Sequence, residues 1–287
     1  MPDQLPAATQ SLTPTVAQFR HKAEVPMLTL GVVLTTIVAL GALYVLFSGW
    51  ELTTFAQGVL VGLFTPILAF FFIRYAFWNT AANSVEVTDK QFPELYAIYR
   101  KLAEEMGFSP EGKGIEKLPR LYVSNGNGLM NAFASKCQLK RGYVVLYSDL
   151  VDLAYTHGDF DTVKFVLAHE LGHIKCGHVS LWRTLIAPVT TALFLDKTVT
   201  RAQEYTADRV ACYYAPEGSL GMISLFAGKN LGPKVDIDEY FNSVDNHKDG
   251  LWLRVSNFMS SHAVGFRRMK ALKNAKTQGW NVHGKML

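Results

Sequence analysis

Two histidines and a glutamate carry the most distinctive chemistry in this sequence. Residues 169–173 read HELGH and fit the pattern H-E-x-x-H, and the apolar residues around them recur at helical spacing. On a helix, His169 and His173 project from one face, where both imidazoles can bind a single zinc ion. Glu170 can take a proton from a water molecule that the metal acidifies. The motif therefore predicts zinc-dependent hydrolysis of peptide bonds.

A second acidic pair follows 31 residues after His173, in the stretch RAQEYTAD at 201–208. Glu204 and Asp208 are four residues apart and share one face of a helix. Glu204 completes a set of two histidines and one glutamate, which leaves the fourth zinc position open as catalytic sites do. Asp208 can orient a ligand histidine through a hydrogen bond.

Two long apolar runs precede this chemistry. Residues 27–47 are 21 residues without a charge, long enough as a helix to reach about 30 Å, and residues 55–73 are 19 more. We expect a transmembrane hairpin. A cleaved signal peptide is the alternative, disfavoured because the first run is long and a second follows at once. Arg20, Lys22 and Arg74 flank the outer ends of the hairpin, which predicts that the rest of the chain faces the cytoplasm.

The rest of the chain shows a mixture of helical and strand patterns. Helical spacing predicts a helix at 92–106, and short apolar runs predict strands at 121–124, 131–135 and 143–147. We expect these strands to form a small antiparallel sheet within a mainly helical domain.

Composition excludes several classes of function. The chain has 287 residues, 49% of them hydrophobic, and a net charge of only +4 without a long basic run, so no nucleic-acid partner is expected. The glycine-rich turn at 125–128 lacks the Lys-Ser/Thr of a phosphate loop, so no nucleotide is expected. Cys137, Cys176 and Cys212 are odd in number and far apart, which favours a reducing compartment over a disulfide framework.

Taken together, the motifs resemble those of the HtpX-like membrane-associated zinc metalloproteases, to which the CaaX prenyl proteases are distant relatives. The similarity covers most residues after Phe92. It rests on the segment 131–133, the motif at 169–173 with a further His178, the stretch 201–208, and Ser261-His262 followed by Arg268. The resemblance implies that His169, His173 and Glu204 bind zinc and that Glu170 is the general base, the same four residues that the spacing selects.

The resemblance also implies roles for residues outside the metal site. The edge strand that pairs with an extended substrate is assigned to Asn131, Ala132 and Phe133. The group that stabilises the tetrahedral oxyanion is assigned to His262 and Arg268. His178 lies off the face of the ligand histidines, so we expect it to act behind them instead of binding the metal.

Two positions depart from the family pattern. Ala263 stands where these proteases usually have a proline. Residues 181–195, where HtpX-type members carry further spanning segments, are too short to cross a bilayer and contain Arg183 and Pro188. We expect a buried or membrane-resting helical hairpin there.

The sequence thus predicts an α+β fold: a mainly helical, zincin-like metalloprotease domain with a small antiparallel sheet, preceded by a two-helix transmembrane hairpin. The expected divisions are an N-terminal tail at 1–26, the hairpin at 27–74 and the protease domain at 75–287. The expected function is a zinc metalloendopeptidase with one Zn²⁺ per chain, anchored in the cell (inner) membrane with its catalytic domain in the cytoplasm.

The expected partners are polypeptides, unfolded or membrane proteins in quality control, together with the lipid bilayer. Two alternatives stay open at this point. One is a non-catalytic membrane scaffold that keeps zinc for folding. The other is a zinc hydrolase that acts on a non-peptide bond.

Overall fold

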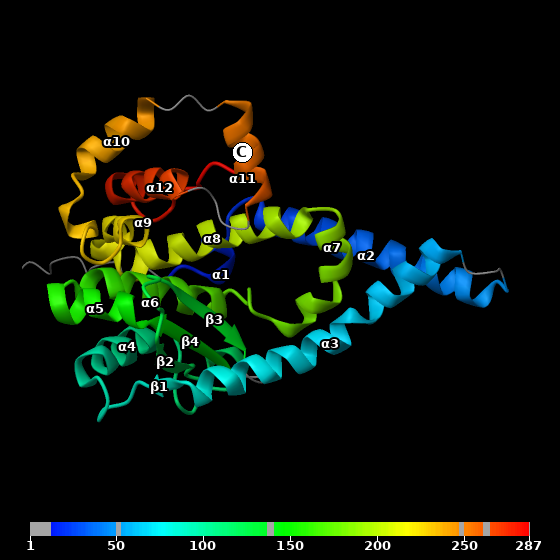
Figure 1. Cartoon of the computed structure of the whole chain (residues 1–287), viewed down its shortest axis with the longest axis horizontal. Helices are drawn as coiled ribbons and strands as arrows, with labels where there is room; N and C mark the ends of the chain where they lie inside the picture. Colours follow the sequence, from blue (N-terminus) through cyan, green and yellow to red (C-terminus); the bar gives the residue numbers. More distant parts are fainter. Residues whose placement is uncertain (1–12, 50–52, 137–140, 247–249, 261–264, 287) are drawn as a thin grey trace, which may run out of the picture.

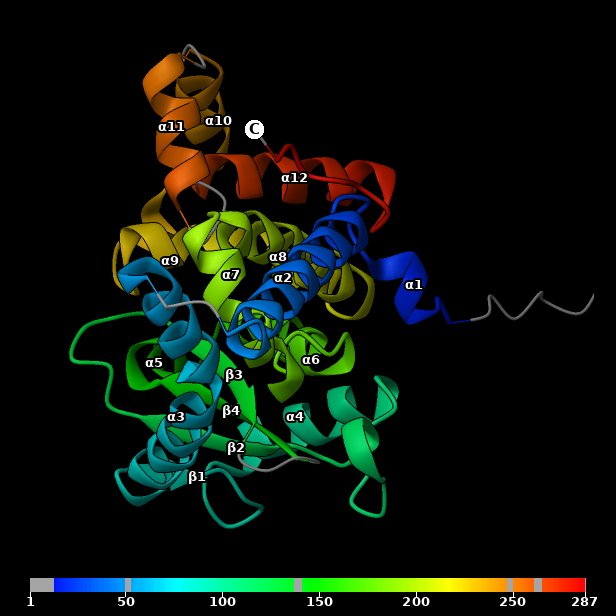
Figure 2. The same cartoon turned by 90° about the vertical axis from the view of Figure 1, so that its right-hand side faces the viewer.

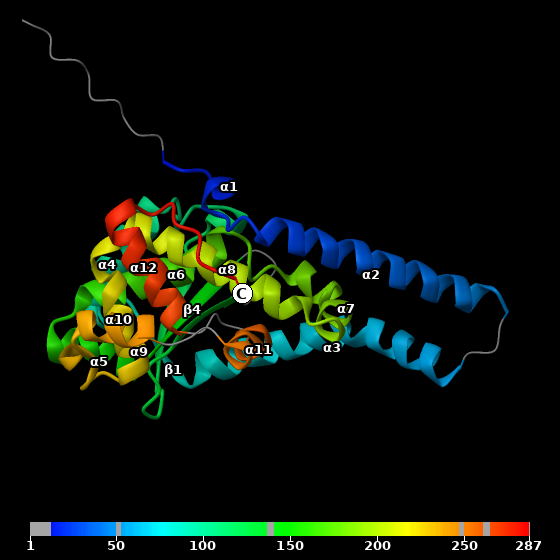
Figure 3. The ribbon, with the colours of Figure 1, turned by 90° about the horizontal axis from the view of Figure 1, so that it is seen from above.

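Two long helices project from the same side of the folded domain (Figures 1 and 3). The computed structural model describes residues 13–49, 53–136, 141–246, 250–260 and 265–286. Helix α2 spans Glu24–Phe47 and α3 spans Thr54–Ala82, and both are long and apolar enough to cross a membrane. Only 6% of the most apolar window of each helix is buried against protein, so neither is the core helix of a soluble fold. The pair indicates a membrane protein.

The domain contains a four-stranded sheet in the order β1-β2-β4-β3. Its strands are β1 (Ser84–Glu86), β2 (Arg120–Ser124), β3 (Ala132–Lys136) and β4 (Gly142–Tyr147). Strands β1 and β2 are antiparallel, as are β3 and β4, but β2 runs parallel to β4, with Leu121 opposite Val144.

The sheet is therefore mixed, and the expected antiparallel arrangement is wrong in this respect. The physical reason is that the β3–β4 hairpin returns with β4 inside the sheet and β3 at its edge. Consecutive residues 143–146 on β4 are all buried, as is typical of a central strand covered on both faces. The rest of the expected fold class, a mainly helical domain that follows two apolar helices, is confirmed.

Helices α6 (Phe160–Lys175) and α8 (Leu195–Tyr214) form the centre of the domain and pack against each other. Asp159 caps α6 by accepting a hydrogen bond from the backbone N–H of Thr162 at 3.0 Å. Gly172 allows the two helices to approach, because a Cβ there would lie 3.1 Å from Cβ of Val210. Helix α6 also packs against β3 and β4, so its HELGH segment lies between the sheet edge and α8.

The remaining elements surround this centre. They are α1 (Val16–Phe19), α4 (Pro93–Glu105), η1 (Gly114–Glu116), α5 (Ser148–His157), η2 (Leu181–Leu185), α7 (Ala187–Ala192), η3 (Pro216–Ile223), α9 (Ser224–Ala227), η4 (Gly232–Lys234), α10 (Ile237–Asn246), α11 (Leu251–Met259) and α12 (Gly265–Gln278). Helix α4 falls where the sequence predicts a helix.

Two segments near the membrane helices are built into the fold. Phe19 is fully buried in the main core, and Arg209 on α8 donates hydrogen bonds to the carbonyls of Gln18, Phe19 and Arg20. Residues 18–20, just before α2, are therefore attached firmly to the domain. Residues 181–192 form two short helical segments, η2 and α7, and α7 packs against both α2 and α3.

Candidate metal centre

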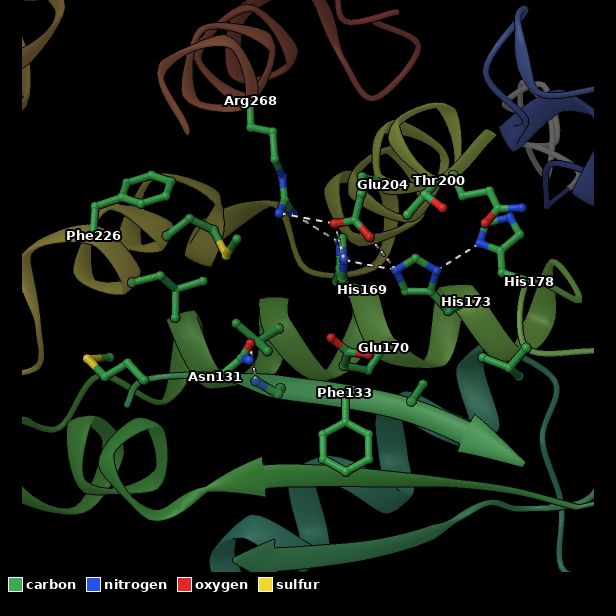
Figure 4. Close-up of a pocket in the computed structure, with 18 residues that line it drawn as sticks. Asn131, Phe133, His169, Glu170, His173, His178, Thr200, Glu204, Phe226 and Arg268 are labelled. Carbon is green, nitrogen blue, oxygen red and sulfur yellow. Dashed lines mark hydrogen bonds and ion pairs between the residues drawn. The ribbon is translucent and has the colours of Figure 1, made fainter. Parts of the chain in front are cut away.

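The side chains of His169, His173 and Glu204 converge at one point (Figure 4). Their ligand atoms lie within 4.8 Å of one another, and they form the metal-binding group found among the described residues. The two Nε2 atoms are 3.1 Å apart. Glu204 places Oε2 3.6 Å from Nε2 of His169 and Oε1 3.4 Å from Nε2 of His173. Two imidazole nitrogens and a carboxylate are the donor set that zinc prefers in catalytic sites.

The hydrogen bonds behind His169 favour positive charge at this point. Oδ1 of Asp208 lies 2.9 Å from Nδ1 of His169, which leaves Nε2 directed at the centre. Burial alone would lower the pKa of His169, but its hydrogen bonds with Asp208 and Glu204 outweigh burial and raise it to about 10. The two carboxylates thus favour positive charge at the position that a metal cation would take. The residues present fit a divalent cation.

Arg268 on α12 holds the two carboxylates in place. Its Nη2 and Nε atoms donate to the two oxygens of Asp208 at 2.6 and 2.9 Å, and Nη1 lies 3.2 Å from Oε2 of Glu204. Burial raises the pKa of Asp208, but Arg268 and His169 together bring it below its usual value. Both donor-bearing edges of this guanidinium therefore face acidic residues of the site.

A second chain of contacts runs from His173 to the first long helix. Nδ1 of His173 is 2.8 Å from Nδ1 of His178. Nε2 of His178 is 3.2 Å from Oε1 of Glu24, which is ion-pair distance without hydrogen-bond alignment. Glu24 is fully buried, pairs with Arg20, and accepts a hydrogen bond from the Thr206 hydroxyl at 2.6 Å. Burial lowers the pKa of His178 to about 4, so this imidazole is neutral.

The carboxylate of Glu24 beside Nε2 of His178 favours the tautomer of neutral His178 that carries its proton on Nε2. In that tautomer Nδ1 of His178 accepts a hydrogen bond from Nδ1–H of His173, 2.8 Å away. This arrangement leaves Nε2 of His173 with a free lone pair for a metal. The sequence analysis did not assign Glu24 to the site. The feature that could have pointed to it is a single acidic residue just before an apolar run.

Glu170 lines the same cavity, which has a volume of about 500 Å³. In Figure 4 its carboxylate lies between the histidines and strand β3. Strand β3 is at the edge of the sheet, where the sequence predicted an edge strand, and residues 130–134 border the cavity. The ring of Phe133 points away from the cavity and packs against Tyr143 and Tyr147, so the small side chains of Ala132 and Ala134 are on the opposite face of β3.

The structure thus brings most of the predicted site residues into one place. The predicted residues that line the cavity or contact the candidate metal ligands are Asn131, Ala132, Phe133, His169, Glu170, His173, His178, Glu204, Asp208 and Arg268. The predicted role of Arg268 at an oxyanion stays a prediction, because its contacts are with Asp208 and Glu204. His262 lies outside the described residues, and its role stays a prediction as well.

The fold and the site define a helical domain with a His-His-Glu metal centre beside a sheet edge. Residues 89–187 match the model of Peptidase family M48. The chain is 28% identical over 189 residues to "Protease HtpX homolog" of Dictyoglomus thermophilum, covering 63% of this chain and 55% of that protein. It is 24% identical over 184 residues to "Plastoglobule-localized metallopeptidase 48, chloroplastic" of Arabidopsis thaliana, covering 58% of this chain and 49% of that protein.

The chain spans about half the length of these curated relatives. No solved structure gives a significant match. The comparisons support the relationship that the motifs predict: residues 89–187 are similar to peptidase family M48, and the chain is similar to an HtpX homologue.

Proposed function

We propose that this chain is a membrane-anchored zinc metalloendopeptidase. The observation that carries the proposal is the convergence of His169, His173 and Glu204 beside Glu170, in a cavity bordered by an edge strand. The match to peptidase family M48 and the printed names of the two relatives support it. The scaffold and non-peptide hydrolase alternatives gain no support from any of these matches.

The residues divide the chemical work as follows. One Zn²⁺ would be held by His169, His173 and Glu204, and when bound it supplies a Lewis acid and makes water acidic enough to ionise near neutral pH. Glu170 accepts a proton from the attacking water and returns it to the nitrogen of the departing amine. Asp208 fixes the imidazole of His169 through Nδ1.

The substrate in this proposal is an extended polypeptide. Strand β3 is an edge strand of the described sheet and borders the cavity, and an extended chain can add to such an edge through main-chain hydrogen bonds. Unfolded proteins, including damaged membrane proteins in quality control, are the proposed substrates. Unfolded substrates should therefore be cut faster than the same proteins when folded, and equal rates would count against strand addition.

The proposed location is the cell (inner) membrane, with the domain in the cytoplasm. Basic residues flank the outer ends of α2 and α3, which supports this orientation. Cys212 is buried, so a thiol probe needs an exposed position such as Lys101 on α4. In intact cells an impermeant maleimide should leave Lys101→Cys unlabelled until the cells are opened. Labelling of intact cells would place the domain outside.

The activity is tested with the full chain purified in detergent. We expect it to cleave unfolded casein, to stop after metal is removed with a chelator, and to recover when about one equivalent of Zn²⁺ is added back. Metal content measured alongside separates loss of metal from loss of fold. Cleavage that continues in verified metal-free protein would overturn the proposal.

A further inference from the structure

Helix α11 carries an apolar face that the domain does not cover. Five of its nine residues are large, apolar and exposed: Leu251, Trp252, Val255, Phe258 and Met259. At 100° per residue they fall on one continuous arc, opposite the packed residues Leu253 and Asn257. Trp252 is 81% exposed and Leu251 72% exposed. A contiguous apolar face of this kind marks a surface that meets a partner or a membrane.

Helix α11 lies on the side of the domain from which the two long helices project. Figure 2 looks at the molecule from that side, and α11 lies nearer the viewer than α12. Figures 1 and 3 show that α11 runs across the direction of α2 and α3. A helix that lies in the plane of a bilayer has this orientation relative to helices that cross it.

The apolar face is continuous with segments that pack on the membrane helices. The ring of Phe258 lies 6.4 Å from that of Phe194, which is exposed together with Leu193 at the end of α7. Helix α7 in turn packs against both α2 and α3. Thr190 on α7 sits so close to Gly31 that a Cβ on Gly31 would lie 2.7 Å from its methyl group.

The position of Gly31 sets the depth of this contact. Gly31 is four residues inside the predicted membrane span 27–47, which corresponds to about 6 Å along the helix. Helix α7 therefore reaches the level of the hydrocarbon boundary, and the apolar face of α11 continues from it. Interfacial helices bury their apolar faces about 5 to 10 Å into this boundary.

From these observations we infer that α11 lies in the bilayer interface, with Leu251, Trp252, Val255, Phe258 and Met259 in contact with lipid. Arg254 lies at the edge of the apolar arc, and with Lys285 it lines a hollow next to Val255 and Phe258. Basic side chains at this level match the charge of anionic lipid headgroups. The inference goes beyond the proposed activity but rests on membrane anchoring by α2 and α3.

A contact between α11 and lipid would also fix the position of α8, the helix that carries Glu204, relative to the membrane. Arg201 on α8 donates to the carbonyls of Phe258 and Ser260 at 2.8 and 2.9 Å, and Lys197 donates to the carbonyl of Met259 at 2.5 Å. These bonds attach the end of α11 to the same helix that carries Glu204. A lipid contact at α11 therefore holds the metal centre at a set height and tilt above the bilayer.

The test uses the full chain in vesicles of phosphatidylcholine and phosphatidylglycerol, on a Cys137→Ser background in which the two described cysteines are buried. A fluorescent label is attached to Val255→Cys, to Leu40→Cys on α2 as a lipid-exposed control, or to Lys101→Cys on α4 as a water-exposed control. Nitroxide lipids and a water-soluble quencher then report the surroundings of each label. All three positions are exposed, so the substitutions spare the core.

We expect nitroxide lipids to quench the label at Val255→Cys and at Leu40→Cys but not at Lys101→Cys. Quenching at Val255→Cys only from water would overturn the inference. Protection from both quenchers would overturn it too, because it would show that protein, such as a second copy, covers α11. If Leu40→Cys itself is not quenched by lipid, the anchoring is wrong, an outcome distinct from failure at α11 alone.

Discussion

His173 and His178 face each other through their Nδ1 atoms, 2.8 Å apart, and Glu24 stands behind His178 at the first residue of α2. A candidate metal ligand is thus connected through two side chains to the start of a helix that is apolar enough to cross a membrane. Residues behind a ligand orient it and adjust its basicity, so the first long helix contributes to the metal centre.

Replacing Glu24 by Gln should weaken zinc binding. The substitution keeps the size of the side chain but removes the negative charge that faces Nε2 of His178, and with it the bias that directs the Nδ1–H of His173 away from the metal position. Loss of such a partner typically lowers metal affinity about 10- to 100-fold. Competition with a chelator of known affinity measures the change.

Arg209→Lys is the matched control, because Arg209 holds the same chain segment through three carbonyls without contacting His178. It should loosen the segment while leaving zinc affinity nearly unchanged. Equal losses of affinity in Glu24→Gln and Arg209→Lys would mean that Glu24 acts only by general packing.

Arg268→Ala should destabilise the metal-free protein by about 3 kcal/mol, since it removes from the buried Asp208 and Glu204 the guanidinium that pairs with both. Urea unfolding of chelator-treated protein measures this free energy. The double variant Asp208→Asn/Arg268→Ala removes one of the stranded charges and should recover part of the loss. No recovery in the double variant would contradict the assignment of Arg268 as the partner of Asp208.

Cys176 and Cys212 should resist thiol reagents in the folded protein. Burial raises the pKa of each thiol to about 12, and both side chains are buried, so very little reactive thiolate is present at neutral pH. With Cys137 replaced by Ser, labelling by iodoacetamide at pH 8 should be slow until denaturant is added. Rapid labelling of two thiols in native protein would disagree with this packing.

Asp149 should contribute stability that is lost in acid. The hydrogen bond from Lys229 at 2.7 Å lowers the pKa of Asp149 below its ordinary 3.8, and the N–H of Gly128 adds to this effect against partial burial. A lowered pKa means that the contribution is fully present above the unfolded value of 3.8 and disappears as the pH falls through the folded value.

Asp149→Asn should therefore be less stable than the native chain at pH 7, and the difference between the two should shrink at pH 3. Paired denaturant titrations at the two pH values measure it. A difference that is the same at both would show that the charge of Asp149 is not the source of its effect.

The sequence predicts the site residues that are neighbours on one and the same helix. His169 and His173, like Glu204 and Asp208, are four residues apart, so each pair must share a face wherever its helix lies. The contact between Glu24 and His178 was not predictable, because 154 residues separate them and only the tertiary fold places the start of α2 beside the turn that follows α6.

The strand order and direction in the sheet also depend on tertiary contacts that the sequence pattern does not show. Short apolar runs located three strands, but strand direction depends on pairing, and β1 has only three residues, too few to show an alternating pattern. The exposure of α11 was also invisible in the sequence, since its apolar spacing is equally typical of a helix packed against a core.

The most direct test of the account compares the native chain with Glu170→Gln, measuring bound zinc and casein cleavage on the same samples. Glu170 lies beside the ligands but is not one of them. The variant is expected to keep about one zinc per chain and its fold while losing about 100-fold or more of its turnover, because the proton acceptor is gone. Cleavage by Glu170→Gln at the native rate, with zinc retained, would contradict the role of Glu170 and the mechanism built on it.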